Sequence, residues 1–257
     1  MNLTEIANRC GTDKGTTHGA GHAYTIVYDL VFRHLRDRPL NLLEIGLAAG
    51  GPEVSGSVSR SVEAIPSIRM WHEYFPQSRI YGLDICDFAQ FETDWFKFFR
   101  ADCGNEAELN QVAANGVEFD IIVDDGSHAS YHQQLALRTL FKILKPGGIY
   151  AIEDLDWQPR AYEAQLPSVL KTTDFLRNGQ TDYTLFMFGD DELARLRKTF
   201  NDSAGLSAAM PHYIDRFGIR GYLRRLGEAA GTTFQASRGI APTATARTKL
   251  AIIQKPE

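Results

Sequence analysis

The sequence is poor in cysteine and in long apolar runs. Its three cysteines, Cys10, Cys86 and Cys103, form no CxxC pair and no paired framework, which favours reduced thiols in a cytoplasmic protein. No stretch approaches about 18 consecutive apolar residues. The first residues also lack a basic segment followed by an apolar one. The sequence thus indicates neither secretion nor a membrane span.

Positive charge is also scarce. The formal net charge is −5, and no basic stripe is present in the 257 residues. Proteins that bind a phosphate backbone usually carry such a stripe, so we expect no nucleic-acid partner. The length suffices for one large α/β domain with a real core, and no internal repeat is visible.

The most informative stretch is 119–154. Residues 119–124, FDIIVD, form an apolar run rich in β-branched residues, which predicts a buried parallel strand. Apolar residues then recur at helical intervals from Ser130, and the KPGG sequence at 145–148 is expected to stop this helix. Residues 148–152 predict a second strand. A right-handed crossover would make the two strands parallel near neighbours.

Acidic residues follow both of these strands. Asp125 comes directly after the first, and Glu153 and Asp154 after the second. Their carboxylates should meet at the carboxyl edge of the sheet, where open α/β sheets bind ligands. An all-oxygen set suits a hard divalent ion such as Mg²⁺. The alternative is that each acid is a solvated loop or cap residue.

Small residues and further acids follow the other predicted strands. Residues 41–46 predict a strand that enters the loop 47–51, LAAGG, whose small side chains allow a ligand to approach the backbone. Asp84 ends the second strand, where such folds hydrogen-bond a ribose diol. Asp102 follows the third and can face an adenine amino group. Together these acids predict a nucleoside pocket.

The segment 1–40 contains a polar loop with Lys14, His18, His22 and Tyr24. Two interpretations stay open: a flexible arm, or a lid whose donors close over a ligand. Residues 52–66 resemble an inserted polar loop.

Several motifs together resemble the class I S-adenosylmethionine-dependent methyltransferases, and most closely the metal-dependent sugar O-methyltransferases of the mycinamicin and macrocin type. They are GTDKG (11–15), HAYT (22–25), LLEIG (42–46), YGLD (81–84), DDGSH (124–128), KPGG (145–148) and IEDL (152–155). The resemblance implies a doubly wound, Rossmann-like, seven-stranded and mostly parallel α/β sheet with lid insertions. It also implies S-adenosyl-L-methionine and Mg²⁺ as cofactors.

The resemblance assigns roles to particular residues. The metal ligands would be Asp125, Glu153 and Asp154, and His128 would be the general base. The residues expected to contact the cofactor are Thr25, Glu44, Gly46, Ser67, Asp84, Asp102, Cys103 and Asp125. The chain would be a single methyltransferase domain (1–257) with an N-terminal arm or lid (1–40), a cofactor- and metal-binding core (41–156) and an acceptor side (157–257).

The chemistry also follows from the residue types. A sugar hydroxyl ionises too weakly near neutral pH, and a divalent ion can acidify it and fix its position. A histidine such as His128 can take the proton as a general base. His132 follows four residues later without the glutamate and third ligand of a zinc protease, so we interpret it as a packing or supporting residue.

The rest of the sequence carries less signal. It predicts a helix over 161–177, a strand over 183–188, a helix over 191–200 and a last strand over 249–254. The pairing partner of the last strand is left open between 183–188 and 232–237. A basic patch at 220–225 is interpreted as a solvated helix face, and the aromatic residues of 157–213 as either an acceptor wall or core.

The predicted function is methylation of a sugar hydroxyl, on a deoxysugar of a natural product or on a mannose or glucose oligosaccharide. The alternatives are a catechol-type O-methyltransferase, a non-haem iron hydroxylase and a non-catalytic nucleotide-binding module. The partner would be a small-molecule or oligosaccharide acceptor, with no nucleic acid and no membrane. The oligomeric state, a homo-oligomer included, stays open.

Overall fold

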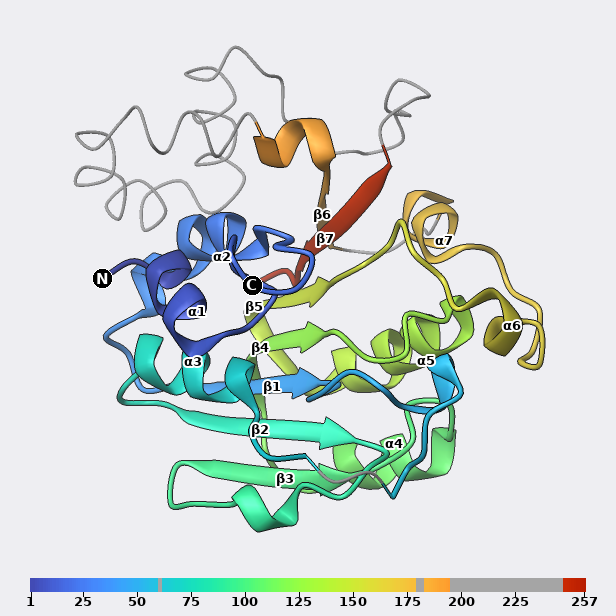
Figure 1. Ribbon diagram of the computed structural model, residues 1–257, viewed down its shortest axis with the longest axis horizontal. Coiled ribbons are helices and arrows are strands. Elements are labelled where there is room, and N and C mark those ends of the chain that lie inside the picture. Colours follow the sequence, from blue (N-terminus) through green and yellow to red (C-terminus); the bar gives the residue numbers. More distant parts are fainter. Residues whose placement is uncertain (60–61, 179–182, 195–246) are drawn as a thin grey trace.

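A computed structural model describes residues 1–59, 62–178, 183–194 and 247–257 (Figure 1). Seven strands form one sheet in the order β3-β2-β1-β4-β5-β7-β6. Their bounds are β1 Asn41–Ile45, β2 Arg79–Asp84, β3 Phe96–Arg100, β4 Phe119–Asp124, β5 Leu144–Ile152, β6 Thr184–Gly189 and β7 Thr248–Gln254. The strands β1 to β5 pair in parallel, and β7 is antiparallel to both neighbours. The predicted mostly parallel, doubly wound sheet is confirmed.

Helices cover both faces of this sheet. They are α1 Leu3–Cys10, α2 Tyr24–Phe32, α3 Pro66–Tyr74, α4 Glu106–Ala113, α5 Ser130–Leu140, α6 Arg160–Glu163 and α7 Thr172–Asn178. Short 3₁₀ turns lie at Arg33–Leu35, Pro52–Val54, Ala89–Phe91 and Phe141–Ile143. Helices α1, α2 and α3 lie on one side and α4 and α5 on the other (Figure 1). This arrangement leaves the ends of the strands open to a ligand.

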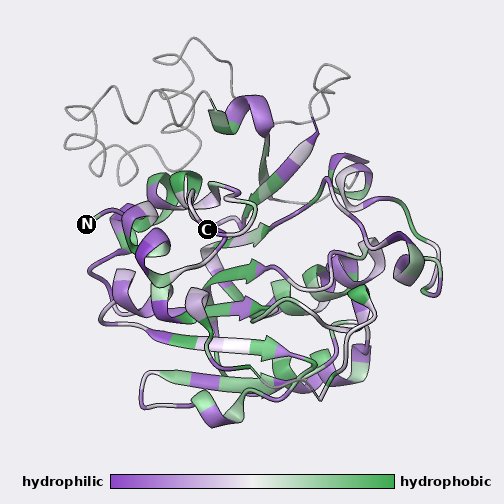
Figure 2. Ribbon diagram, viewed as in Figure 1, coloured by the Kyte–Doolittle hydropathy of each residue, from purple (hydrophilic) through white to green (hydrophobic). Residues whose placement is uncertain are grey.

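Alternating side chains of the strands build two separate cores. In β4, Ile121 and Val123 pack with α1, α2 and α3, whereas Ile122 packs with α4 and α5. Both faces of each central strand are therefore apolar, which explains why the strand sequences read as continuous hydrophobic runs. Figure 2 shows this concentration of apolar residues along the central strands.

Two predicted boundaries are wrong for identifiable reasons. The helix expected over 161–177 is split into α6 and α7, and residues 164–171 are not helical. Pro167 lies in this gap, where it lacks the N–H that a helix interior requires. The KPGG sequence does not end a helix but lies within β5, because α5 already ends at Leu140. Helix α4 has no counterpart among the predicted elements.

The end of the sheet answers one open question. Strand β6 pairs with β7 over Thr184–Gly189, so 183–188 is a neighbour of the last strand. Residues 190–194 are helical, as expected, but the rest of that predicted helix lies outside the described residues. The same applies to residues 210–213, to the basic patch 220–225 and to 232–237. Within the described ranges, none of the helices combines the length and the apolar character needed to cross a membrane.

Candidate active site

A cavity of about 490 Å³ opens at the carboxyl ends of the parallel strands. The segments that follow β1, β2, β3, β4 and β5 all contribute to its walls, as does the loop between α1 and α2. This is the edge at which open α/β sheets bind ligands, and the volume lies in the usual range for small-molecule sites.

Most of the residues expected to contact the cofactor line this cavity: Gly46, Ser67, Asp84, Asp102, Cys103 and Asp125. Thr25 and Glu44 do not. The buried Thr25 has its hydroxyl 3.0 Å from that of Thr4, and Glu44 is fully buried beside Lys14. The cofactor assignment of all eight residues stays a prediction.

The two acids expected to bind the nucleoside also organise the loops around them. Asp84 accepts hydrogen bonds from the backbone N–H groups of Leu47 (2.9 Å) and Cys86 (2.8 Å). Asp102 accepts one from Gly104 (2.7 Å). Asp84 thus joins the loop after β1 to the loop after β2, so it supports the wall of the cavity whether or not it contacts a ribose.

The loop after β1 needs glycine at its first position. Gly46 has φ +82°, and a Cβ atom there would lie 2.1 Å from the carbonyl oxygen of Asp125. The N–H of Asp125 in turn bonds the carbonyl of Ile45 at 2.9 Å. The close approach of these two loops fixes Asp125 against the cavity.

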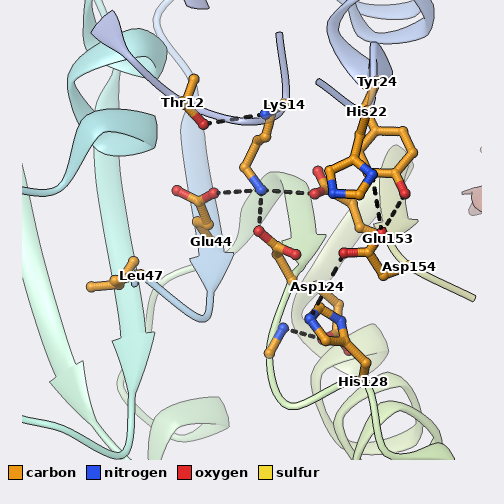
Figure 3. A network of polar contacts seen from close by, with 12 residues as sticks. Thr12, Lys14, His22, Tyr24, Glu44, Leu47, Asp124, His128, Glu153 and Asp154 are labelled. Carbon is orange, nitrogen blue, oxygen red and sulfur yellow. Dashed lines mark hydrogen bonds and ion pairs between the residues drawn. The ribbon is translucent and has the colours of Figure 1, made fainter. Parts of the chain in front are cut away.

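The three predicted metal ligands, Asp125, Glu153 and Asp154, lie at the ends of β4 and β5, but only two of them belong to a group that could share an ion. Asp125, His128 and Asp154 each offer a ligand atom, and these atoms lie within 4.8 Å of one another. The Nε2 atom of His128 is 3.8 Å from Oδ2 of Asp154. Glu153 is outside this group, because its carboxylate points to other partners (Figure 3).

The partners of Glu153 come from the N-terminal segment. Its Oε1 accepts a hydrogen bond from the Tyr28 hydroxyl at 2.5 Å, and its Oε2 accepts one from the Lys14 ammonium at 2.8 Å. Lys14 also contacts Asp125, and Tyr24 donates to Oδ1 of Asp154 at 2.5 Å. Side chains of the arm 1–40 therefore contact all three predicted metal ligands, and its role as a lid stays a prediction.

Burial and mutual repulsion weaken the acids of this cluster. Burial raises the pKa of Glu44 to about 7, although the charge of Lys14 opposes the rise. Burial also raises the pKa of Asp125 and, together with the charge of Asp125, that of Glu153. Such a set favours a cation that can satisfy several carboxylates at once.

Two site residues have unusual backbone conformations. His128 and Asp154 adopt φ +59° and +51°, in the left-handed region that non-glycine residues rarely occupy. Strained positions of this kind cluster at functional sites, where the surrounding structure holds them in place. Both residues line the cavity.

Sequence reasoning missed the depth of Lys14 and the role of Tyr28. Tyr24 and Tyr28 stand four residues apart on α2, and this spacing places them on one helix face beside the acids. That periodic pair was the available signal. His132 is buried with Nδ1 2.8 Å from the Ser127 hydroxyl and 3.6 Å from Sγ of Cys103, consistent with a supporting role.

The strand order and the position of the cavity define the fold of the class I S-adenosylmethionine-dependent methyltransferases. The solved MycE methyltransferase of the mycinamycin pathway, in complex with Mg and SAH, has this fold. It matches all of this chain and 55% of its own, with a TM-score of 0.58 and 24% identity.

Curated relatives are sugar O-methyltransferases. An enzyme of Streptomyces olivaceus, 8-demethyl-8-(2-methoxy-alpha-L-rhamnosyl)-tetracenomycin-C 3'-O-methyltransferase, is 37% identical over 153 residues, which are 60% of this chain and 36% of the relative. Mycinamicin VI 2''-O-methyltransferase of Micromonospora griseorubida is 36% identical over 156 residues, again 60% and 36%. Demethylmacrocin O-methyltransferase of Streptomyces fradiae is 37% identical, with the same coverage.

The matched region spans little more than a third of the length of these relatives. No family model matches the chain. The resemblance to sugar O-methyltransferases that the motifs indicate is confirmed over the matched region.

Proposed function

We propose that this chain is an S-adenosylmethionine- and Mg²⁺-dependent O-methyltransferase that methylates a sugar hydroxyl. The observation that carries the proposal is the placement of Asp125, His128 and Asp154 on one wall of a cavity whose other walls are the loops after β1, β2 and β3. Similarity to sugar O-methyltransferases over 60% of the chain supports it. The proposal covers the chain as one domain with the arm, core and acceptor side expected from the sequence.

The residues present fit a hard divalent ion. Asp125 and Asp154 offer carboxylate oxygens within 4.8 Å of each other, and oxygen is the ligand type that Mg²⁺ prefers. Glu153 adds a third carboxylate to the same region but is held by Lys14 and Tyr28. Because Mg²⁺ disfavours nitrogen, the imidazole of His128 stays available for a proton.

The chemical roles follow from these contacts. When bound, Mg²⁺ supplies the positive charge that acidifies a hydroxyl and orients it. His128 removes the hydroxyl proton at Nε2, and Asp154, 3.8 Å away, stabilises the imidazolium that results. The cavity walls would hold the acceptor and the cofactor beside each other, and such positioning contributes much of the rate of a group transfer.

The cofactor would lie against the loops after β1, β2 and β3, with Gly46, Asp84 and Asp102 on its side of the cavity. The acceptor would then enter past Trp157, which lines the cavity, is 45% exposed and meets the ring of His128 edge to face at 5.3 Å. We propose as acceptor a deoxysugar of a natural product or a mannose or glucose oligosaccharide.

Methyl transfer to a panel of glycosides and catechols, with and without a chelator, tests this function. The proposal expects transfer to glycosides that stops on chelation and returns with Mg²⁺. Transfer to catechols alone would favour a catechol-type enzyme. The absence of S-adenosylmethionine binding in calorimetry would overturn the proposal altogether.

A further inference from the structure

Lys14 is a buried cation held by three acids from three different strands. Its side chain is 2% exposed. The ammonium lies 2.8 Å from Oε2 of Glu153 and 3.2 Å from Oε1 of Glu44, and it contacts Oδ2 of Asp125. Figure 3 shows the side chain of Lys14 reaching between Glu44 and Glu153. These acids end or follow β1, β4 and β5, so one ammonium joins the ends of three parallel strands.

The backbone around Lys14 is fixed as well. Its carbonyl accepts a hydrogen bond from the N–H of Thr25 at 3.1 Å, and the carbonyl of Gly15 accepts one from Ala23 at 2.8 Å. The N–H of His22 bonds the carbonyl of Asp13 at 2.9 Å. The loop is therefore pinned at several points to the start of α2, and Lys14 is a structural part of the site rather than a mobile surface lysine.

The charges around Lys14 do not balance. Glu44 and Glu153 are buried, and the partly exposed Asp125 and Asp154 lie beside them. The other hydrogen-bond donors to the Glu153 and Asp154 side chains are the neutral hydroxyls of Tyr28 and Tyr24. An unpaired buried carboxylate is costly, and several close together repel one another. One ammonium compensates part of this charge when no metal is bound.

We propose that Lys14 is a positioning residue of the metal site. Its ammonium holds Asp125 and Glu153 together when no metal is bound, and it weakens Mg²⁺ binding by like-charge repulsion. This inference rests on the proposed function, because it takes these carboxylates to be the metal-binding region. The ammonium and the ion share Asp125. Lys14 therefore lowers the affinity of the site for a divalent ion. Because Lys14 belongs to the arm 1–40, this affinity depends on the position of the arm.

The inference predicts that Lys14→Met lowers the stability of the metal-free protein but raises its affinity for Mg²⁺. Lys14→Met removes the charge but keeps a side chain of similar length. The metal-free protein should lose stability, because the buried Glu44 and Glu153 and the partly buried Asp125 lose their common partner. Mg²⁺ should nevertheless bind on the order of tenfold more tightly, because the repulsion between the two cations is gone. A residue with a purely structural role would not produce the second effect.

The experiment is titration of metal-stripped protein with Mg²⁺ alone by calorimetry, together with thermal unfolding with and without Mg²⁺. Lys145→Met is the matched control, since Lys145 pairs with Asp120 at 2.8 Å near the opposite end of β5. Lys14→Met should bind Mg²⁺ more tightly and gain more thermal stability from it than the wild type. Lys145→Met should match the wild type in both, and Lys14→Arg, which keeps the charge, should retain the wild-type affinity.

Unchanged or weaker Mg²⁺ binding by Lys14→Met would overturn the inference. So would a Lys14→Met or Lys14→Gln protein that stays unfolded at saturating Mg²⁺, since the ion would then fail to replace the ammonium. If the wild type binds Mg²⁺ and transfers methyl groups while Lys14→Met binds no more tightly, only the inference fails. If Lys14→Met alone binds Mg²⁺, the inference stands and the proposed metal dependence of the wild type fails.

Discussion

The hydroxyl of Tyr24 donates a hydrogen bond to Oδ1 of Asp154 at 2.5 Å, which connects the first turn of α2 to the loop after β5. The ring of His22 stacks on Tyr24 and places Nδ1 3.6 Å from the same oxygen. The orientation of a proposed metal ligand is thus set by a segment 130 residues away in the chain.

Tyr24→Phe should therefore weaken the site without unfolding the protein. Partners that orient a metal ligand typically contribute about 10- to 100-fold to metal affinity or activity. We expect a loss of about tenfold in Mg²⁺ affinity, measured by calorimetry. Tyr131→Phe, in the first turn of α5 and outside the residues that line the cavity, is the control and should bind Mg²⁺ as the wild type does. Equal affinities in all three proteins would show that this hydrogen bond does not orient Asp154.

Gly46→Ala should destabilise the protein severely. The added methyl group would lie 2.1 Å from the carbonyl oxygen of Asp125, at a φ of +82°. The control is Gly116→Ala, which has a similar φ of +85° but no atom within 4 Å of the added Cβ. The control should cost only about 1 kcal/mol for the backbone strain, while Gly46→Ala should cost several. Denaturant unfolding measures both, and similar costs would contradict the account.

His128→Ala should lower kcat by roughly 10²- to 10⁴-fold, the usual contribution of a general base. Binding of S-adenosylmethionine should persist, because the loops after β1, β2 and β3 are unchanged. The control is His72→Ala, because His72 lies on α3, stacks on Trp95 and is outside the residues that line the cavity. Unchanged turnover in His128→Ala would remove His128 from the proposed mechanism.

The stability of the protein should depend on pH through Glu44. Burial raises the pKa of this carboxyl from 4.5 to about 7 in the folded protein. Protonated Glu44 therefore favours the folded state below pH 4.5, and this contribution is lost as the pH rises through 7. The two pKa values differ by an amount that corresponds to about 3 kcal/mol.

Glu44→Gln removes this dependence. The wild type should lose about 3 kcal/mol of unfolding free energy relative to Glu44→Gln between pH 4 and pH 8, as measured by urea unfolding. Glu118→Gln, at an exposed position before β4, should follow the wild type. Parallel curves for wild type and Glu44→Gln would mean that the folded and unfolded states bind protons at Glu44 equally.

The sequence allowed the sheet and the acidic strand ends to be predicted because both are local signals. A run such as FDIIVD is apolar on both faces and ends at Asp124, so the sequence predicts both that the strand is buried and where it ends. The position of Lys14 could not be predicted in this way. Its partners Asp125 and Glu153 lie 111 and 139 residues away, and a polar Gly/Thr-rich loop favours a surface location by composition alone.

The error at 161–177 had a local cause. The apolar spacing there matched a helix, but Pro167 separates α6 from α7. The proline was a sufficient signal, since it excludes a continuous helix more strongly than periodicity supports one.

The central claim is that carboxylates at the ends of β4 and β5 bind a divalent ion in the cavity. A crystal structure of the protein with Mn²⁺ and S-adenosylhomocysteine, examined by anomalous scattering, tests it most directly. The account predicts one strong peak within coordination distance of Asp125 and Asp154, next to the cofactor. A peak only at the other group of potential ligands in the described part of the chain, Asp102, Cys103 and His132, or no peak at all, would contradict it.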